Sequence, residues 1–240
     1  MRKLLEHAGR LLIGGHRGCI CDYPENSIRA MEEGVRRGAD YLEIDVQLTR
    51  DGIPVIFHDT RLEQRTSLSG YVHETTYEEM KAGIPGICTL CEAMEWGAAQ
   101  HAWFGLELKT VPLDMQPFNM RLVEKISAVL SDTGMLNQVF VFGQDYQVLK
   151  HLRAVDKNVI LGLIVPYVPA DPVRLMRDMD ATVYLSYIYN MTPEIIKELH
   201  ENGFYISGAI LREEQWMERA KQLGVDMFET DYPDRVKKRT

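Results

Sequence analysis

Short runs of β-forming residues alternate with amphipathic helical patterns along almost the whole chain, and this alternation constrains the fold most. The β-rich runs cover residues 11–15, 41–48, 54–58, 104–109, 139–142, 160–165, 182–187, 204–210 and 225–229. The helical patterns cover residues 26–37, 89–101, 117–132, 145–154, 171–179, 193–202 and 213–223. Strands that alternate with helices form βα units, and successive βα units build a parallel sheet.

One β-rich run is surplus to an eight-stranded barrel, and the connection between the second and third runs explains it. A parallel crossover needs a dozen or more residues, but only residues 49–53 separate these two runs. Asp51-Gly52 is a two-residue hairpin signal, so we expect residues 54–58 to pair antiparallel with residues 41–49. Eight parallel strands remain. The sequence therefore predicts a (β/α)₈ TIM barrel with one short antiparallel hairpin strand.

The length and composition are those of one such barrel. The chain has 240 residues, of which 45% are hydrophobic, and no linker or shift in composition indicates a second domain. We expect a single domain over residues 1–240, with residues 60–88 as a small insertion at the barrel mouth, because that segment is too irregular for one βα loop. The net charge of −8 argues against a nucleic-acid-binding protein, which would need a basic face.

The hydrophobic runs are short and interrupted. None approaches the roughly 20 residues that a membrane-spanning helix needs. Glu6, His7 and Arg10 interrupt the N-terminal segment where a secretory signal would lie. We therefore expect a cytoplasmic protein that acts on a small molecule, and the sequence leaves the formation of an oligomer open.

Three titratable side chains converge in the predicted hairpin. With a two-residue turn at Asp51-Gly52, Asp45 lies directly opposite His58, and opposed residues share a face. Glu43 is two residues from Asp45 and is therefore on that face too. A hairpin face exposed to water would also carry such residues. Central barrel strands are buried on both sides, however, and should be almost entirely apolar.

Two further strands carry charged groups where a barrel core should be apolar. Glu107 and Lys109 alternate with leucines in 104–109, and His16-Arg17 ends the first strand. Active sites of TIM barrels lie at the carboxyl ends of the strands. The three carboxylates favour a hard divalent cation over zinc, and the two histidines remain for acid and base work. With Arg17 and Lys109 to neutralise an anion, the set fits phosphodiester cleavage.

Five motifs follow one another in a specific order: HRG at 16–18, PENS at 24–27, EIDVQLTRDGIPVIFHD at 43–59, LELK at 106–109 and GVDMFETDYP at 224–233. In this order they resemble the glycerophosphodiester phosphodiesterase family over nearly the whole chain. The resemblance implies a TIM barrel with one divalent cation, Mg²⁺, Ca²⁺ or Mn²⁺. It assigns Glu43, Asp45 and Glu107 as the metal ligands, His16 and His58 as the acid/base pair, and Arg17 and Lys109 as the residues near the phosphate.

The same resemblance implies a reaction. The deprotonated glycerol 2-hydroxyl attacks phosphorus, the alcohol leaves, and water opens the cyclic phosphate to give glycerol 3-phosphate. Two alternatives stay open. One is a lysophospholipase D-type or other phosphodiesterase activity on the same site, and the other is a non-catalytic phosphodiester-binding protein.

Some residues depart from the family pattern on the substrate side of the pocket. Many relatives carry Ser-Ser-Phe where this chain has Phe142, Gly143 and Gln144, and a Trp-Thr pair where it has Ser207 and Gly208. These departures leave the accepted head group open.

Several other polar residues and cysteines have a local interpretation. Asn26 could belong to the site, but it is expected to be the N-cap of the helix that follows it. Asp231 is expected to cap a loop rather than to act in catalysis. Cys19-x-Cys21 and Cys88-x-x-Cys91 have spacings that suit zinc or an iron–sulfur cluster, but we expect four ordinary thiols, because the second pair falls where the family usually begins a helix.

Overall fold

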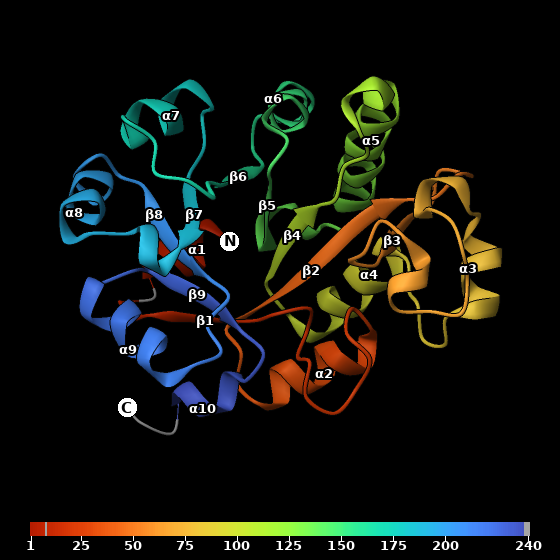
Figure 1. The fold of residues 1–240 in the computed structure, drawn as a ribbon, viewed down its shortest axis with the longest axis horizontal. Helices are drawn as coiled ribbons and strands as arrows, with labels where there is room; N and C mark the ends of the chain where they lie inside the picture. Colours follow the sequence, from red (N-terminus) through yellow and green to blue (C-terminus); the bar gives the residue numbers. More distant parts are fainter. Residues whose placement is uncertain (8, 238–240) are drawn as a thin grey trace.

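Eight parallel strands close into a barrel in the computed structural model, which describes residues 1–7 and 9–237 (Figure 1). The strand order is β1-β9-β8-β7-β6-β5-β4-β2, and β1 pairs with the start of β2 to close the ring. The extra strand, β3, pairs antiparallel with the last three residues of β2. The predicted TIM barrel with one extra hairpin strand is therefore confirmed. The strands are β1 (Leu12–Gly15), β2 (Tyr41–Leu48), β3 (Pro54–Ile56), β4 (Phe104–Leu108), β5 (Val139–Gly143), β6 (Ile160–Ile164), β7 (Val183–Tyr187), β8 (Tyr205–Ala209) and β9 (Met227–Thr230).

The helices that connect the strands cover the outside of the barrel (Figure 1). The α-helices are α1 (Arg2–His7), α2 (Ile28–Arg36), α3 (Tyr77–Gly83), α4 (Leu90–Gln100), α5 (Gln116–Asp132), α6 (Tyr146–Val155), α7 (Pro172–Asp178), α8 (Pro193–Glu201), α9 (Glu214–Leu223) and α10 (Pro233–Lys237). Short 3₁₀ helices are η1 (Leu62–Gln64), η2 (Val72–Glu74), η3 (Leu113–Met115), η4 (Met135–Gln138) and η5 (Ile188–Asn190). The sequence patterns predicted α2 and α4–α9 but missed α1, α3 and α10.

Helix starts follow from the residues that precede them. Thr89 accepts a hydrogen bond from the backbone of Glu92, whose side chain reaches back to Thr89, and this capping box begins α4. Thr192 caps α8 with Pro193 in the first turn. At the other end of a helix, Gly224 has φ of 75° and ends α9 in the left-handed conformation that glycine adopts without strain.

The end of the barrel at which the strands begin is covered by α1. Met1 and Leu5 are buried against residues that begin the strands, among them Leu12, Tyr41 and Val183. Because this apolar cluster fills the amino ends of the strands, the polar residues of the barrel are left for the carboxyl ends. No helix in the described part of the chain has the length and apolar composition that crossing a membrane requires.

The hairpin between β2 and β3 has a three-residue turn, so the predicted two-residue turn was wrong. The backbone amide of Thr49 donates to the carbonyl of Ile53, and Gly52 donates back to Thr49. Gly52 has φ of 80°, as expected for a type I turn followed by a left-handed residue. The register is therefore shifted by one residue: Phe57, and not His58, donates its amide to the carbonyl of Asp45.

Residues 60–88 carry η1, η2 and α3 and lie beside the β2–β3 hairpin (Figure 1). Their apolar side chains form a small core of their own with the end of the hairpin: Val55 and Phe57 pack with Leu62, Val72 and Met80. This segment is anchored to the hairpin that also carries His58, so it fixes the direction in which the chain leaves β3.

Candidate active site

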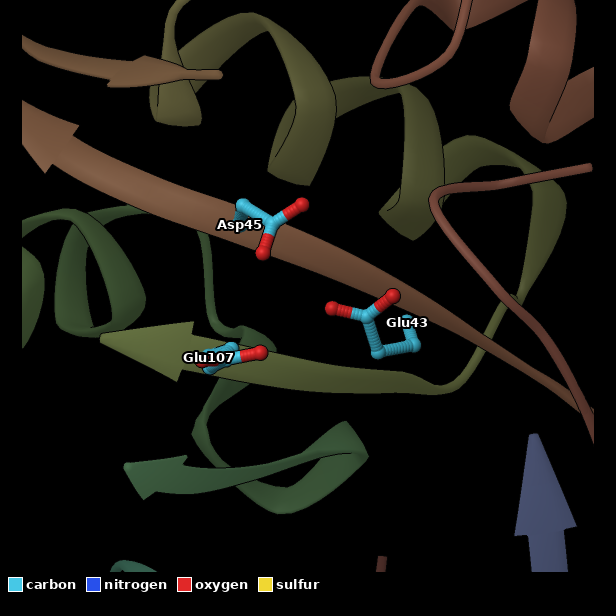
Figure 2. A group of neighbouring side chains, drawn as sticks. All are labelled: Glu43, Asp45 and Glu107. Carbon is cyan, nitrogen blue, oxygen red and sulfur yellow. The ribbon is translucent and has the colours of Figure 1, made fainter. Parts of the chain in front are cut away.

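Three carboxylates meet above two neighbouring strands (Figure 2). Glu43 and Asp45 lie on β2 and Glu107 lies on β4, and the parallel register pairs Asp45 with Glu107. One carboxylate oxygen from each residue lies within 4.8 Å of the others. Glu43 and Asp45 are almost fully buried. The structure thus brings together the three residues predicted as metal ligands.

The carboxylate cluster fits a divalent cation. Oε1 of Glu43 is buried and has no hydrogen-bond partner among the residues that the structure describes. Burial, together with the charge of Asp45, raises the pKa of Glu43 well above its usual value. A cation bound here would give the orphaned oxygen a partner and would favour the ionised carboxylate. Since all the ligand atoms are oxygens, the residues suit Mg²⁺, Ca²⁺ or Mn²⁺.

Lys109 lies against two of these carboxylates. Its Nζ is 3.1 Å from Oδ1 of Asp45 and 2.5 Å from Oε1 of Glu107. Burial alone would lower the pKa of Lys109, but the two carboxylates outweigh it and raise the pKa. Burial likewise opposes ionisation of Asp45, but the charges of Lys109 and His58 lower its pKa. Both groups therefore carry charge at neutral pH.

Arg17 links the first strand to two carboxylates of the cluster and to Glu25. Its backbone amide donates to Oε2 of Glu43 at 2.8 Å, its guanidinium donates to Glu25 at 2.7 Å, and its Nε lies 3.5 Å from Oδ2 of Asp45. Arg17 has φ of 51°, and the next residue, Gly18, packs so closely on α2 that a Cβ atom would lie 2.8 Å from its backbone. The tight His16-Arg17-Gly18 turn therefore requires this glycine.

His16 follows β1 directly and is nearly buried. Its Nδ1 lies 2.7 Å from Oδ1 of Asp231, and its Nε2 lies 4.0 Å from Oε2 of Glu43. Burial lowers the pKa of His16, even though the hydrogen bond to Asp231 acts in the opposite direction. The ring is therefore neutral at neutral pH, with Nδ1 donating to Asp231 and Nε2 directed to the cluster.

Asp231 has a larger role than the loop cap predicted from the sequence. It accepts hydrogen bonds from His16 and, through Oδ2, from Nε of Arg212 at 2.5 Å. Burial opposes ionisation, but these two bonds lower the pKa of Asp231. This role could have been predicted from the sequence, because Asp231 follows the carboxyl end of the last strand. His16 was selected as a site residue for the same position on the first strand.

His58 reaches the site beyond the end of β3. Its Nδ1 lies 2.6 Å from Oδ1 of Asp59. The side chain of Gln47, two residues after Asp45 on β2, donates to the carbonyls of Phe57 and Asp59 at 2.7 and 3.0 Å. Gln47 thus holds the segment that carries His58, a contact that was not predicted from the sequence.

The prediction that Asn26 is the N-cap of α2 was wrong. Ser27 is the N-cap, and its Oγ accepts a hydrogen bond from the backbone amide of Ala30. The Asn26 side chain turns instead to Asp45, donating to Oδ2 at 2.7 Å and accepting from the backbone amide at 3.1 Å. Its φ of 57° allows this direction, and asparagine tolerates the left-handed conformation better than most residues. Asn26 therefore fixes the orientation of a candidate metal ligand.

A cavity of about 230 Å³ opens onto these groups. Its walls include His16, His58, Glu107 and Lys109, so both predicted acid/base residues face the same space. Among the departures from the family pattern, Phe142 and Gln144 line the cavity, whereas Ser207 and Gly208 do not. Glu229 of β9 lines it as well, and this buried carboxylate was not predicted from the sequence.

A second and wider cavity of about 960 Å³ adjoins the first and shares Gln144, Ile164 and Pro166 with it. Its remaining walls come from the insertion and from the segments that follow β4, β5 and β6: Thr60, Tyr71, His73, Thr110, Val111, Pro112, Leu113, Asp114, Met115, Asp145, Tyr146, Gln147 and Tyr167. The site therefore continues into a mostly apolar and aromatic space.

The cysteine pairs do not join into a metal site. Cys19 and Cys88 are buried, Cys91 is exposed, and all four are free thiols. Within residues 1–7 and 9–237, the only group of three or more metal-ligating residues is the carboxylate cluster.

Comparison with known proteins gives consistent matches. The model of the Glycerophosphoryl diester phosphodiesterase family matches residues 16–235. A glycerophosphodiester phosphodiesterase of Caldanaerobacter subterraneus is 27% identical, over 94% of this chain and 96% of its own length. One from Bacillus altitudinis is 28% identical over 94% and 96%. An Oleispira antarctica phosphodiesterase solved with the product sn-glycerol-3-phosphate superposes with a TM-score of 0.89 at 22% identity, covering 97% of both chains.

Proposed function

Because this chain belongs to the glycerophosphoryl diester phosphodiesterase family and is a phosphoric diester hydrolase, we propose that it cleaves glycerophosphodiesters into glycerol 3-phosphate and an alcohol with one divalent cation and two histidines. The observation that carries this proposal is the shared cavity. His16 and His58 face the same space as Glu107 and Lys109, beside the carboxylate cluster.

Each residue has a distinct role in this proposal. Glu43, Asp45 and Glu107 would hold Mg²⁺, Ca²⁺ or Mn²⁺, which would supply charge neutralisation at the phosphate. Arg17 and Lys109 add positive charge at the same place.

The two histidines would move the protons. Nδ1 of His16 is held by Asp231, and Nδ1 of His58 is held by Asp59. Nε2 of each ring is therefore the atom left to exchange a proton. One ring takes the proton of the attacking hydroxyl, and the other protonates the leaving alcohol.

The experiment is a panel of glycerophosphodiesters coupled to detection of glycerol 3-phosphate, with Mg²⁺, Ca²⁺ and Mn²⁺ in turn. EDTA should abolish turnover, and one of the three cations should restore it. His16→Ala and His58→Ala should each lower kcat by about 10²–10⁴-fold. The exposed His200 of α8 provides the control, and His200→Ala should retain wild-type kcat. Wild-type turnover in either cavity variant would contradict the assigned roles.

The wider cavity favours a second candidate, a lysophospholipase D-type activity on the same site. The cavity at the catalytic groups has about 230 Å³, but the adjoining one has about 960 Å³ and includes Leu113, Met115 and Tyr167. A space of this size and apolar character suits a substrate with an acyl chain. Including lysophosphatidylcholine in the panel and measuring released choline would decide: a higher kcat/KM than for glycerophosphocholine would favour the acyl substrate. Binding without product across the panel would favour the non-catalytic alternative.

A further inference from the structure

Cys19 and Cys21 form a close pair of thiols beside the candidate active site. Their Sγ atoms lie 3.0 Å apart, on the segment that directly follows His16, Arg17 and Gly18. Cys19 is fully buried, whereas Cys21 is partly exposed. The pair therefore combines a thiol that solvent can reach with a second thiol close behind it.

Both thiols contact the residue that holds His16. The Sγ atoms of Cys19 and Cys21 lie 3.4 and 3.0 Å from the backbone carbonyl oxygen of Asp231, to which each can donate its hydrogen. The side chain of Asp231 accepts the hydrogen bond from Nδ1 of His16. Two thiols, one carbonyl and one imidazole thus form a continuous chain of contacts.

We propose that Cys19 and Cys21 are a reversible disulfide site, oxidised by a low-molecular-weight disulfide, and that oxidation displaces Asp231 and through it His16. In the first step the thiol of Cys21 attacks the small disulfide, forming a mixed disulfide and releasing one small thiol. In the second step Cys19 attacks the Cys21 sulfur and releases the second small thiol. Two protein thiols are oxidised, one disulfide is reduced to two thiols, and the protons leave with those thiols.

The order of attack follows from the surroundings. Cys21 is partly exposed and Cys19 is fully buried, so a small disulfide reaches the Cys21 sulfur first. Burial also raises the pKa of the Cys19 thiol, which disfavours a direct attack by Cys19 on the small disulfide. The sulfurs need to approach by only about 1 Å to reach the bond length of a disulfide.

Oxidation changes the contacts of Asp231 directly. A disulfide has no S–H group, so the backbone carbonyl of Asp231 loses both donors. The approach of the sulfurs also pulls on the segment next to His16. Displacing a catalytic group by about 1 Å can lower the rate by about 10²-fold, so we expect oxidation to lower kcat by at least tenfold.

The other two cysteines provide an internal comparison. The Cys88 Sγ donates to the carbonyl of Asn26 at 3.8 Å, and the Cys91 Sγ contacts Glu95 at 3.6 Å. Neither contact joins one cysteine to another. Oxidation by a small disulfide should therefore consume two thiols as a pair at residues 19 and 21.

The site itself is tested by mass spectrometry, independently of activity. The reduced protein is equilibrated with mixtures of reduced and oxidised glutathione, alkylated and digested with trypsin. Cleavage after Arg17 and Arg29 yields one peptide that contains both Cys19 and Cys21. The expected result is an unalkylated peptide lighter by two hydrogen atoms, converted back by dithiothreitol. Two alkylated cysteines in this peptide at the most oxidising mixture would overturn the proposal.

The link to His16 rests on the proposed function, and it has two readouts. Oxidation should lower kcat at least tenfold with little change in KM, and it should shift the NMR signal of the His16 ring. Cys21→Ser keeps a hydrogen-bond donor for Asp231 but cannot form the disulfide, so it should keep its activity and NMR signal under oxidant. Cys91→Ser should respond like the wild type.

These results separate the two ideas. A disulfide that leaves both kcat and the His16 signal unchanged would overturn the link to His16. If no diester is cleaved, the proposed function fails, while the peptide mass and the NMR signal still decide this proposal.

Discussion

Nδ1 of His16 lies 2.7 Å from Oδ1 of Asp231, although 215 positions separate the two residues in the chain. The barrel creates this contact, because β1 and β9 are neighbouring parallel strands and Gly15 pairs with Thr230. His16 directly follows β1 and Asp231 directly follows β9, so the two residues lie side by side at the carboxyl ends of these strands. An aspartate in this position fixes the tautomer and the direction of the imidazole ring.

Asp231→Asn should therefore lower kcat strongly while leaving the fold intact. The asparagine amide can present its NH₂ group to Nδ1, which favours the wrong tautomer of His16. We expect a loss on the order of 10²-fold or more in kcat, measured with saturating metal and substrate. Arg212→Ala is the matched control: it removes only the bond to Oδ2 of Asp231, from a side chain that is half exposed. Equal kcat in Asp231→Asn and the wild type would refute the positioning role.

Asn26→Gly should weaken metal binding. Glycine accepts the φ of 57° at this position, so the substitution removes the two hydrogen bonds to Asp45 without adding backbone strain. Residues that orient a metal ligand typically contribute 10–100-fold to affinity. We expect the Kd for the activating cation, measured by calorimetry, to rise by about that factor. A Kd equal to that of the wild type would show that Asp45 needs no support from Asn26.

Gln47→Leu should impair catalysis without weakening metal binding. The substitution leaves the carbonyls of Phe57 and Asp59 without the donor that fixes the segment around His58. An unpaired buried acceptor costs about 1–3 kcal/mol, and the segment can move to relieve this cost. We expect kcat to fall about tenfold or more while the cation Kd stays within twofold, the reverse of the pattern for Asn26→Gly. A raised Kd with unchanged kcat would contradict this division of roles.

The fold could be predicted from the sequence because its signals are local and repeated. Alternating strand and helix patterns indicated βα units, and Asp51-Gly52 explained the surplus strand. The register of that hairpin was wrong by one residue because it depends on the conformation of the turn. An Asp-Gly pair is compatible with a two-residue turn and also with the observed three-residue turn. In the observed turn only Gly52 takes the left-handed conformation.

The residues of the candidate site also fall into two groups, those that could be predicted from a single strand and those that could not. Charged residues on strands that should be apolar pointed to Glu43, Asp45, Glu107 and Lys109, because their anomaly is visible one strand at a time. The contacts of Asn26 and Gln47 were not predicted because their partners lie on other segments. The preference of asparagine for the N-cap favoured a local role for Asn26 that proved incorrect. Contacts of this kind exist only once the barrel has closed.

The buried carboxyl group of Glu229 should make the metal-free protein less stable as the pH rises. Burial, with the charges of Glu107 and Asp45, raises the pKa of Glu229 to about 8, from its ordinary value of 4.5. The folded protein therefore holds a proton that the unfolded chain releases above its lower pKa. The free energy of unfolding must then fall as the pH rises from about 4.5 to about 8, by up to a few kcal/mol from this group.

Glu229→Gln keeps the size of the side chain and removes this titration. In urea unfolding with EDTA at pH 5, 6.5 and 8, the wild type should lose stability with rising pH, and the variant should lose less. Some decline should remain, because burial also raises the pKa of Glu43 and Glu107. Glu198→Gln, at an exposed position on α8, should follow the wild-type curve. Parallel curves for Glu229→Gln and the wild type would show that Glu229 is ionised in the folded protein at neutral pH.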